Sequence, residues 1–401
     1  MKTMNRPAAR PDQAKPSRAQ PIPLTPKRHT PFDETAGLPA SAENYAGGPT
    51  IKEWPKRLFQ LVFRMVPYPT RPRLIKIGHP TRNSPVLVTT NYDLTVRRVC
   101  RAIDGIDCYL LVAPAGGLDV WCAAGGGRFN IDSIISIIKT SRIAELVDHR
   151  RLILPELCAS GINMFELKRR TGWIAVFGPV EASSIPQFLQ TKLKTEAMTR
   201  ISFTIKERLE MAVAMWGSLS LRFTLFPGLI FGWRASLWFI LVVALLSLGV
   251  SLGCFILPGK TFVQKAGFLG LLGILLMLGG LIYVQQATPS EVLKWISIIG
   301  FASFLAGTSF PSYSPYWPCG YSKLFYGSCD LELTVIEEQC IGCKICDHVC
   351  PVECFALTEQ RKMAFVKPEV CIGCGACLIQ CPTNAIINEV AEDHLRQGAC
   401  G

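Results

Sequence analysis

The chain has 401 residues, of which 49% are hydrophobic and 18% charged, and its formal net charge is +12. This length allows two or three domains, and so apolar a composition argues against a purely soluble protein and for membrane segments. Eight of the 17 cysteines lie in two short runs, which excludes a dispersed disulfide framework and indicates iron–sulfur chemistry in a reducing compartment.

The first 48 residues are rich in Pro, Ala, Arg and Lys and lack apolar periodicity, so we expect a disordered basic tail. Residues 1–76 hold 14 Lys and Arg against five Asp and Glu, which places +9 of the net charge here. No continuous apolar run is present, which argues against a secretory signal peptide. The tail lacks the interleaved aromatic residues typical of nucleic-acid binding. We therefore expect its positive charge to attract membrane lipid or simply to increase solubility.

Between residues 49 and 200, short apolar runs alternate with amphipathic segments, which predicts a Rossmann-like α/β domain with a parallel, doubly wound sheet. Ligands of such sheets bind beyond the carboxyl ends of the strands. Thr90 and Asn91 lie at such an end, because Thr90 is the last residue of the first predicted strand and Asn91 comes directly after it. The predicted strands span Val86–Thr90, Asp107–Val112, Leu152–Pro155 and Trp173–Val180, and the predicted helices span Leu94–Ile103, Asp132–Lys139 and Asn163–Arg170.

The segment 117–127 contains one cysteine, Cys122, among good helix formers. Val120–Ala124 can form little more than one helical turn, which Gly125–Gly127 end. This geometry presents a single thiol at the tip of an α/β unit and lets a large flat ligand approach the backbone. The alternative is a buried structural cysteine, which is the commoner role of a cysteine.

The run Val120–Gly125 reads Val-Trp-Cys-Ala-Ala-Gly and resembles the cap helix of the mercury-methylating corrinoid protein family, whose motif is Asn-Val-Trp-Cys-Ala-Ala-Gly-Lys. In that family the cysteine is the lower axial ligand of a corrinoid cobalt, so the resemblance implies this role for Cys122. The resemblance extends over the α/β domain and implies corrinoid contacts from Thr90, Asn91, Asp119, Val120, Trp121, Cys122, Ala123, Ala124 and Gly125.

Two positions depart from the family motif. Asp119 stands in place of the Asn and adds a carboxylate beside the thiol, and Gly126 stands in place of the Lys and removes a cation. We expect corrinoid binding to survive both changes, whereas they leave the methyl acceptor more open. Trp121 either packs on the corrin or is a plain core aromatic residue.

Residues 205–310 contain four apolar segments, which predict an α-helical transmembrane domain. The segments 235–257 and 266–284 lack charged residues and reach the ~20 residues that cross a bilayer. The segment 211–233 contains Arg222, and an Arg near the bilayer centre costs roughly 2.5–3.5 kcal/mol. Both flanking domains need the reducing cytoplasm, which requires an even number of spans across the cytoplasmic (inner) membrane. We therefore predict four spans, and the alternative is two spans with the other two segments lying in the membrane interface. The predicted spans are 211–233, 235–257, 266–284 and 295–310, and a connector at 311–332 contains Cys319 and Cys329.

Residues 333–390 contain two runs of the form CxxCxxCxxxCP, the spacing of small α+β bacterial ferredoxins with two [4Fe–4S] clusters. In that pattern, three close cysteines bind one cluster and the fourth cysteine of each run binds the other. Two zinc sites are the alternative, although zinc sites rarely have this spacing. Cys354 lies outside the pattern and is expected to be a core thiol. The predicted ligands are Cys340, Cys343, Cys346 and Cys381 for the first cluster, and Cys371, Cys374, Cys377 and Cys350 for the second.

The same segment resembles the ferredoxin partner of the mercury-methylating protein, here fused to it in one chain. That partner ends in a pair of adjacent cysteines, whereas the C-terminal tail at 391–401 contains a single cysteine, Cys400. Cys400 is therefore either a soft-metal thiolate or a plain tail residue.

These features predict a membrane-anchored corrinoid-dependent methyltransferase. The five histidines form no D-x-H-x-x-G motif of the kind that places an imidazole under cobalt. A thiolate donates more strongly than an imidazole and favours release of a methyl group with its electrons, which suits the soft acceptor Hg(II) that the resemblance suggests. The clusters would return cobalt to its reduced state with electrons from an upstream low-potential reductant, and fusion raises their effective concentration.

The resemblance also implies a separate methyltetrahydrofolate-dependent methyltransferase as methyl donor, because this chain shows no donor-binding barrel. Two alternatives stay open. One is a corrinoid methyltransferase with another metal, metalloid or thiol acceptor. The other is a membrane-bound ferredoxin-type electron carrier without a corrinoid.

Overall fold

The computed structural model describes residues 54–62, 67–201, 204–225, 233–253, 333–368, 371 and 373–388, with isolated positions between 229 and 290. The chain divides into two units, Met1–Leu38 and Pro39–Gly401, and all described residues belong to the second. The predicted tails at 1–48 and 391–401, Cys400, and the predicted connector with Cys319 and Cys329 lie outside the described residues.

A five-stranded sheet in the order β1-β3-β2-β4-β5 forms the centre of the α/β domain. The pairs among β2 to β5 are parallel, but β1 runs antiparallel to β3, from Arg73 opposite Val112 to Ile77 opposite Cys108. The sheet is therefore mixed, not wholly parallel as predicted. The strands are β1 (Arg73–Ile77), β2 (Val86–Thr90), β3 (Cys108–Ala113), β4 (Arg151–Leu154) and β5 (Ile174–Phe177).

Strand β1 was not among the predicted strands, and its composition explains why. Arg73 and Lys76 interrupt its apolar run, and both are half-buried at the edge of the sheet. The central strands β2 and β3 are buried along their whole length and read as continuous apolar runs, as strands covered on both faces do.

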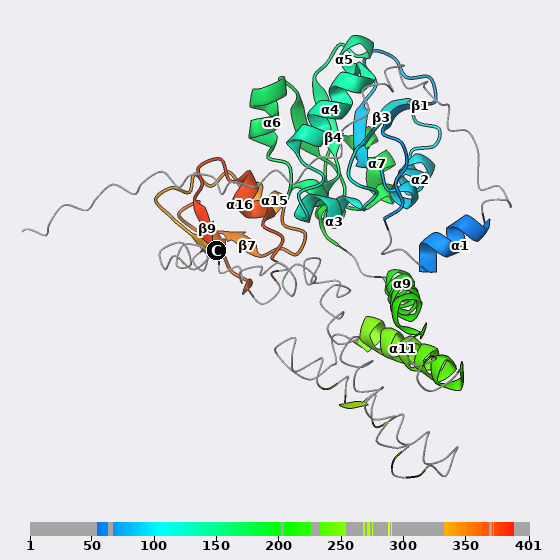
Figure 1. Ribbon diagram of the computed structural model, residues 1–401. Helices are drawn as coiled ribbons and strands as arrows, with labels where there is room; N and C mark the ends of the chain where they lie inside the picture. Colours follow the sequence, from blue (N-terminus) through cyan, green and yellow to red (C-terminus); the bar gives the residue numbers. More distant parts are fainter. Residues whose placement is uncertain are drawn as a thin grey trace, which may run out of the picture. The chain divides into compact units, whose positions relative to one another are not determined.

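Helices cover both faces of the sheet (Figure 1). One face packs on α2 (Asp93–Ala102) and α7 (Ile185–Thr191). The other packs on α3 (Val120–Gly125), α4 (Ile131–Ser141) and α6 (Met164–Thr171), with Phe129, Ile134 and Leu167 fully buried. Short elements complete the domain: α5 (Ile143–Leu146), η3 (Glu156–Cys158), η4 (Ala182–Ser184) and α8 (Glu196–Thr199).

Three further helices are α1 (Trp54–Val62), α9 (Ile205–Phe223) and α11 (Trp233–Gly253), and α9 packs against both of the others. Residues predicted as the first two membrane spans thus form a packed helix pair, in which the indole N–H of Trp216 donates to the carbonyl of Ile240 at 3.2 Å. Within the described ranges, no helix is at once long and apolar enough to cross a bilayer.

This finding overturns the predicted transmembrane domain at 205–310 and, with it, the predicted multi-pass localisation in the inner membrane. Part of the apolar character of α9 and α11 serves helix packing, because side chains such as Met215 and Val243 are buried within the protein, whereas Leu237 of α11 is exposed. The predicted spans at 266–284 and 295–310 lie outside the described residues, apart from isolated positions.

The C-terminal region is a small α+β, ferredoxin-like unit with two strand pairs and two short helices. Strand β6 (Leu333–Val335) pairs with β9 (Ile386–Asn388), and β7 (Phe355–Leu357) pairs with β8 (Met363–Phe365), both antiparallel. Each cysteine run contributes one short helix: α15 (Ile345–His348) and α16 (Ala376–Gln380). Cysteines form much of the core of this unit.

Candidate functional site

Cys122 lies in the first turn of α3, on a backbone that is fixed from both ends. Asp119 is the N-cap, and its Oδ1 accepts a hydrogen bond from the backbone N–H of Cys122 at 2.9 Å, which satisfies a donor that a helix N-terminus leaves open. Ala123 and Ala124, next in the turn, are buried in the core, whereas Cys122 is exposed. The turn therefore presents the thiol at the surface of a rigid element.

Asn91 fixes the loop that leads into α3. Its Oδ1 accepts hydrogen bonds from the backbone N–H groups of Ala115 (2.9 Å) and Gly117 (3.0 Å), and its Nδ2 donates to the carbonyl of Thr70 (3.0 Å). Gly117 has φ +70°, and a Cβ there would lie 2.5 Å from the backbone nitrogen of Pro69, so this loop requires glycine. Asn91 is 5% exposed and acts here as a support for the cap.

We expect Asn91→Ala to destabilise the α/β domain by at least about 2 kcal/mol, because it leaves two buried backbone N–H groups and one carbonyl without partners at roughly 1–3 kcal/mol each. Anaerobic urea unfolding measures this change. The exposed Asn83 offers a matched control as Asn83→Ala, and equal midpoints for the two variants would contradict the supporting role.

The other predicted corrinoid contacts divide by burial. Thr90 is fully buried, and its hydroxyl has no hydrogen-bond partner among the described residues. Among the predicted contacts in the cap, those that a large ligand can reach lie at the surface. They are the half-buried Asp119, Val120 and Trp121 and the exposed Cys122 and Gly125.

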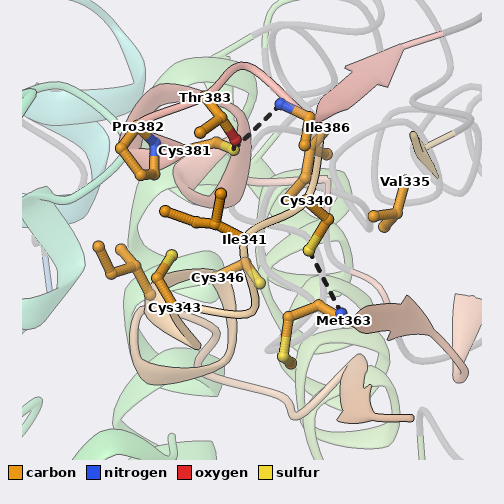
Figure 2. Close-up of a pocket in the computed structure, with 12 residues that line it drawn as sticks. Val335, Cys340, Ile341, Cys343, Cys346, Met363, Cys381, Pro382, Thr383 and Ile386 are labelled. Atoms are coloured by element: carbon orange, nitrogen blue, oxygen red, sulfur yellow. Dashed lines mark hydrogen bonds between the residues drawn. The ribbon is translucent and has the colours of Figure 1, made fainter. Parts of the chain in front are cut away.

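The four cysteines predicted for the first cluster line one pocket (Figure 2). Cys381 comes from the second cysteine run, yet it lies with the three close cysteines of the first. The Sγ of Cys381 accepts a hydrogen bond from the backbone N–H of Ala385 at 3.2 Å, and the Sγ of Cys340 accepts one from Met363 at 3.4 Å. Backbone N–H groups that point at cluster sulfurs tune the reduction potential.

The cysteines predicted for the second cluster also interact with one another. Interaction with the Cys354 thiol lowers the pKa of Cys350 to about 7 and that of Cys371 to about 7. The backbone N–H of Cys354 also donates to the Sγ of Cys350 at 3.3 Å. Burial raises the pKa of Cys377 well above its usual value, and the neighbouring thiols Cys374, Cys350 and Cys371 add to this effect. Cys354, predicted as a core thiol, is 1% exposed and interacts with two predicted ligands, Cys350 and Cys371.

In the part of the chain that the structure describes, no group of three or more His, Cys, Asp or Glu side chains is arranged to hold a single metal ion. The choice between iron–sulfur clusters and zinc therefore depends on the CxxCxxCxxxCP spacing of the sequence, which zinc sites rarely have.

Both regions match known families. Residues 63–189 match the family described as CO dehydrogenase/acetyl-CoA synthase delta subunit, and residues 339–386 match the 4Fe-4S dicluster domain family. The chain therefore joins a corrinoid/iron–sulfur-type α/β domain to a 4Fe–4S dicluster domain. The corrinoid and iron–sulfur part of the predicted resemblance is thus supported, whereas mercury methylation stays a prediction.

Individual relatives cover the same α/β region. The chain is 37% identical over 126 residues, 31% of its length, to the acetyl-CoA decarbonylase/synthase complex subunit gamma of Methanopyrus kandleri and covers 27% of that protein. The counterpart from Methanocaldococcus jannaschii is 37% identical over the same share of the chain, with 25% of its own length covered. The corrinoid/iron–sulfur protein large subunit of Moorella thermoacetica is 35% identical over 130 residues, 32% of this chain and 29% of its own. The chain thus spans between a quarter and a third of these relatives.

A buried carboxylate that sequence reasoning missed lies in η3, which packs against α3. Glu156 is 1% exposed, and burial raises its pKa from 4.5 to about 7 although Lys194 beside it attracts the charged form. The Nζ of Lys194 donates to Glu156 Oε2 at 2.5 Å and to the carbonyl of His348 at 3.2 Å. No sequence pattern marks this pair, because its members lie 38 residues apart.

Glu156 makes stability depend on pH in a defined direction. Between pH 4.5 and about 7 the unfolded chain loses this proton while the folded protein keeps it, so the free energy of unfolding falls as pH rises. We expect the wild-type protein to lose roughly 3 kcal/mol over this range relative to Glu156→Gln, at about 1.4 kcal/mol per pH unit. Unfolding midpoints of both proteins across pH 4.5–8 test this, and parallel curves would contradict it.

Proposed function

We infer that this chain is a corrinoid-dependent methyl-transfer protein in which the Cys122 thiolate binds cobalt and the C-terminal domain supplies electrons. The observation that carries this proposal is an exposed thiol on a capped, buried turn, within a domain similar to the corrinoid/iron–sulfur protein large subunit of Moorella thermoacetica. Cys122 lies in the segment that the sequence resemblance identifies as the cobalt-binding cap.

The residues of the cap fit a large flat cofactor with a metal at its centre. When bound, a corrinoid supplies a cobalt atom that accepts and gives up a methyl group. Cys122 would hold this metal, and its sulfur, a strong electron donor, would favour release of the methyl group to a soft electrophile. Asp119 fixes the backbone that carries the thiol, because its carboxylate accepts a hydrogen bond from the Cys122 N–H. Trp121, half-buried beside them, would pack on the ring.

The C-terminal domain would hold two [4Fe–4S] clusters, the first on Cys340, Cys343, Cys346 and Cys381 and the second on the other four motif cysteines. They would supply the electrons that keep the cobalt reduced, drawn from a low-potential donor outside the chain. The methyl group would come from a separate methyltetrahydrofolate-dependent methyltransferase, as the sequence resemblance implies.

The proposed acceptor is Hg(II), on the strength of the Val120–Gly125 motif. A second candidate rests on the relatives, whose names place them in acetyl-CoA decarbonylase/synthase complexes: this chain would then pass its methyl group to a partner subunit of such a complex. The two candidates share the cobalt site and differ only in what receives the methyl group.

Cobalt analysis of the full-length chain, produced and purified without oxygen, tests the proposal. We expect about one cobalt per chain and the absorption bands of a corrinoid. Protein that has iron and sulfide but no cobalt would make the chain an electron carrier and overturn the proposal. Methylmercury formed by cells that express the chain, and not by cells with a Cys122→Ala variant, would assign Hg(II) as acceptor.

A further inference from the structure

Gln380 is the last residue of α16, between two predicted cluster ligands, Cys377 and Cys381. It is 0% exposed, although glutamine is usually a surface residue. Its Nε2 donates to the carbonyls of Ala159 and Ile162, both at 2.7 Å, and its Oε1 accepts from the backbone N–H of Met164 at 3.1 Å. Every one of these partners belongs to the α/β domain.

A second amide makes the contact reciprocal. The Nδ2 of Asn163 donates to the carbonyl of Ile379 in α16 at 2.5 Å, while its Oδ1 caps α6 through the N–H groups of Phe165 and Glu166. Ala376, at the other end of α16, is buried in the core cluster of the α/β domain. The cysteine-bearing helix α16 is thus seated on the segment 159–164 by polar and apolar contacts together.

Charged and backbone contacts surround this seat. Lys194 joins Glu156 to the carbonyl of His348, Arg200 forms an ion pair with Glu353, and Ile201 donates its backbone N–H to a carbonyl of the second domain at 3.2 Å. Together with the buried hydrogen bonds of Gln380, these contacts favour one relative placement of the parts that they join.

The segment that receives α16 also supports the cap helix. A Cβ at Gly161 would lie 2.6 Å from the carbonyl oxygen of Phe129 and 2.9 Å from that of Ala124, so its backbone lies directly against the end of α3. Ala124 is two residues from Cys122. Gln380 therefore contacts the segment 159–164, and this segment in turn contacts the end of α3, the helix that carries the thiol.

We propose that Gln380 docks the iron–sulfur domain on residues 159–164 and positions it for electron transfer to the corrinoid. The proposal rests on the function inferred above. In the step concerned, one electron leaves a reduced [4Fe–4S] cluster for Co(II), which becomes Co(I), and the oxidised cluster is reduced again by a low-potential one-electron donor outside the chain. Gln380 is a positioning residue, since it touches neither metal centre.

The test uses the full-length, cluster-loaded protein and the variants Gln380→Ala and Gln380→Glu. The second variant keeps the size and the acceptor for Met164 but places a carboxylate against two carbonyl oxygens. Gln339→Ala is the matched control, because Gln339 also directly precedes a predicted cluster ligand, Cys340, and is exposed. Iron and sulfide content and cluster potentials verify that each variant is folded and loaded.

Two readouts decide the outcome. Hydrogen exchange of a peptide covering 159–166 needs no corrinoid, and we expect it to speed up about tenfold or more in both Gln380 variants, as the loss of buried hydrogen bonds predicts, and not in the control. Reduction of Co(II) by pre-reduced clusters, followed by stopped-flow absorption, should slow at least about tenfold at unchanged cluster potentials.

Unchanged exchange in Gln380→Ala would overturn the docking, and faster exchange with an unchanged rate of cobalt reduction would overturn the positioning role. Protein without cobalt would overturn the proposed function and the electron-transfer step together, and the exchange data would still decide whether Gln380 docks the domain.

Discussion

Cys122→Ala is expected to weaken corrinoid binding by at least about 100-fold, because loss of groups that only support a metal ligand already costs roughly 10–100-fold. The thiol is the one soft donor in the exposed part of the cap, and a methyl side chain leaves cobalt to a water molecule. Titration of the anaerobic apoprotein with a corrinoid, followed by absorption, measures the affinity. Any corrinoid that still binds should show the spectrum of a water-ligated cobalt.

Cys100→Ala provides the matched control for this prediction. Cys100 belongs to the same domain but is buried in the core at 3% exposed, and burial raises the pKa of its thiol to about 11, so it is not available as a thiolate. Its replacement should leave corrinoid affinity unchanged, and iron content should be equal in both variants. Equal affinity and equal spectra for Cys122→Ala and the wild type would contradict cobalt ligation by this sulfur.

The short cap helix was predictable because its signals are local. Good helix formers at Val120–Ala124 and the glycines after them predicted one turn, and the structure has α3 at Val120–Gly125. Continuous apolar runs likewise predicted β2 exactly where it lies. The roles of Asn91 and Thr90 were harder to predict, since a position at the carboxyl end of a strand does not say whether a side chain faces a ligand or is buried below it.

Features that depend on distant parts of the chain escaped sequence reasoning. The edge strand β1 is antiparallel because of how it pairs with β3, which lies more than 30 residues later in the chain. The interface at Gln380 joins residues more than 200 positions apart. Apolar composition also misled where two explanations compete: a helix pair such as α9 and α11 and a membrane span both need long apolar segments. Only the packing of such segments distinguishes the two.

Cys381→Ala should remove or damage the first cluster even though this residue belongs to the second cysteine run. The reason is its position in the pocket with Cys340, Cys343 and Cys346 (Figure 2). We expect iron to fall from about eight atoms per chain toward about four, in line with one lost [4Fe–4S] cluster. Iron and acid-labile sulfide analysis of anaerobic protein measures this fall.

A pair of double variants shows which cluster is lost. If Cys381 shares a cluster with Cys343, then Cys343→Ala adds nothing to Cys381→Ala, and one cluster with about four iron atoms remains. Cys374→Ala combined with Cys381→Ala would then strike both clusters and leave almost no iron. If each cysteine run bound its own cluster, the opposite iron contents would follow. Cys374→Ala with Cys381→Ala would leave one cluster, and Cys343→Ala with Cys381→Ala would leave almost no iron. Because residues that act on one site are non-additive and residues on separate sites are additive, the two iron contents decide between the arrangements even if each single variant loses the same amount.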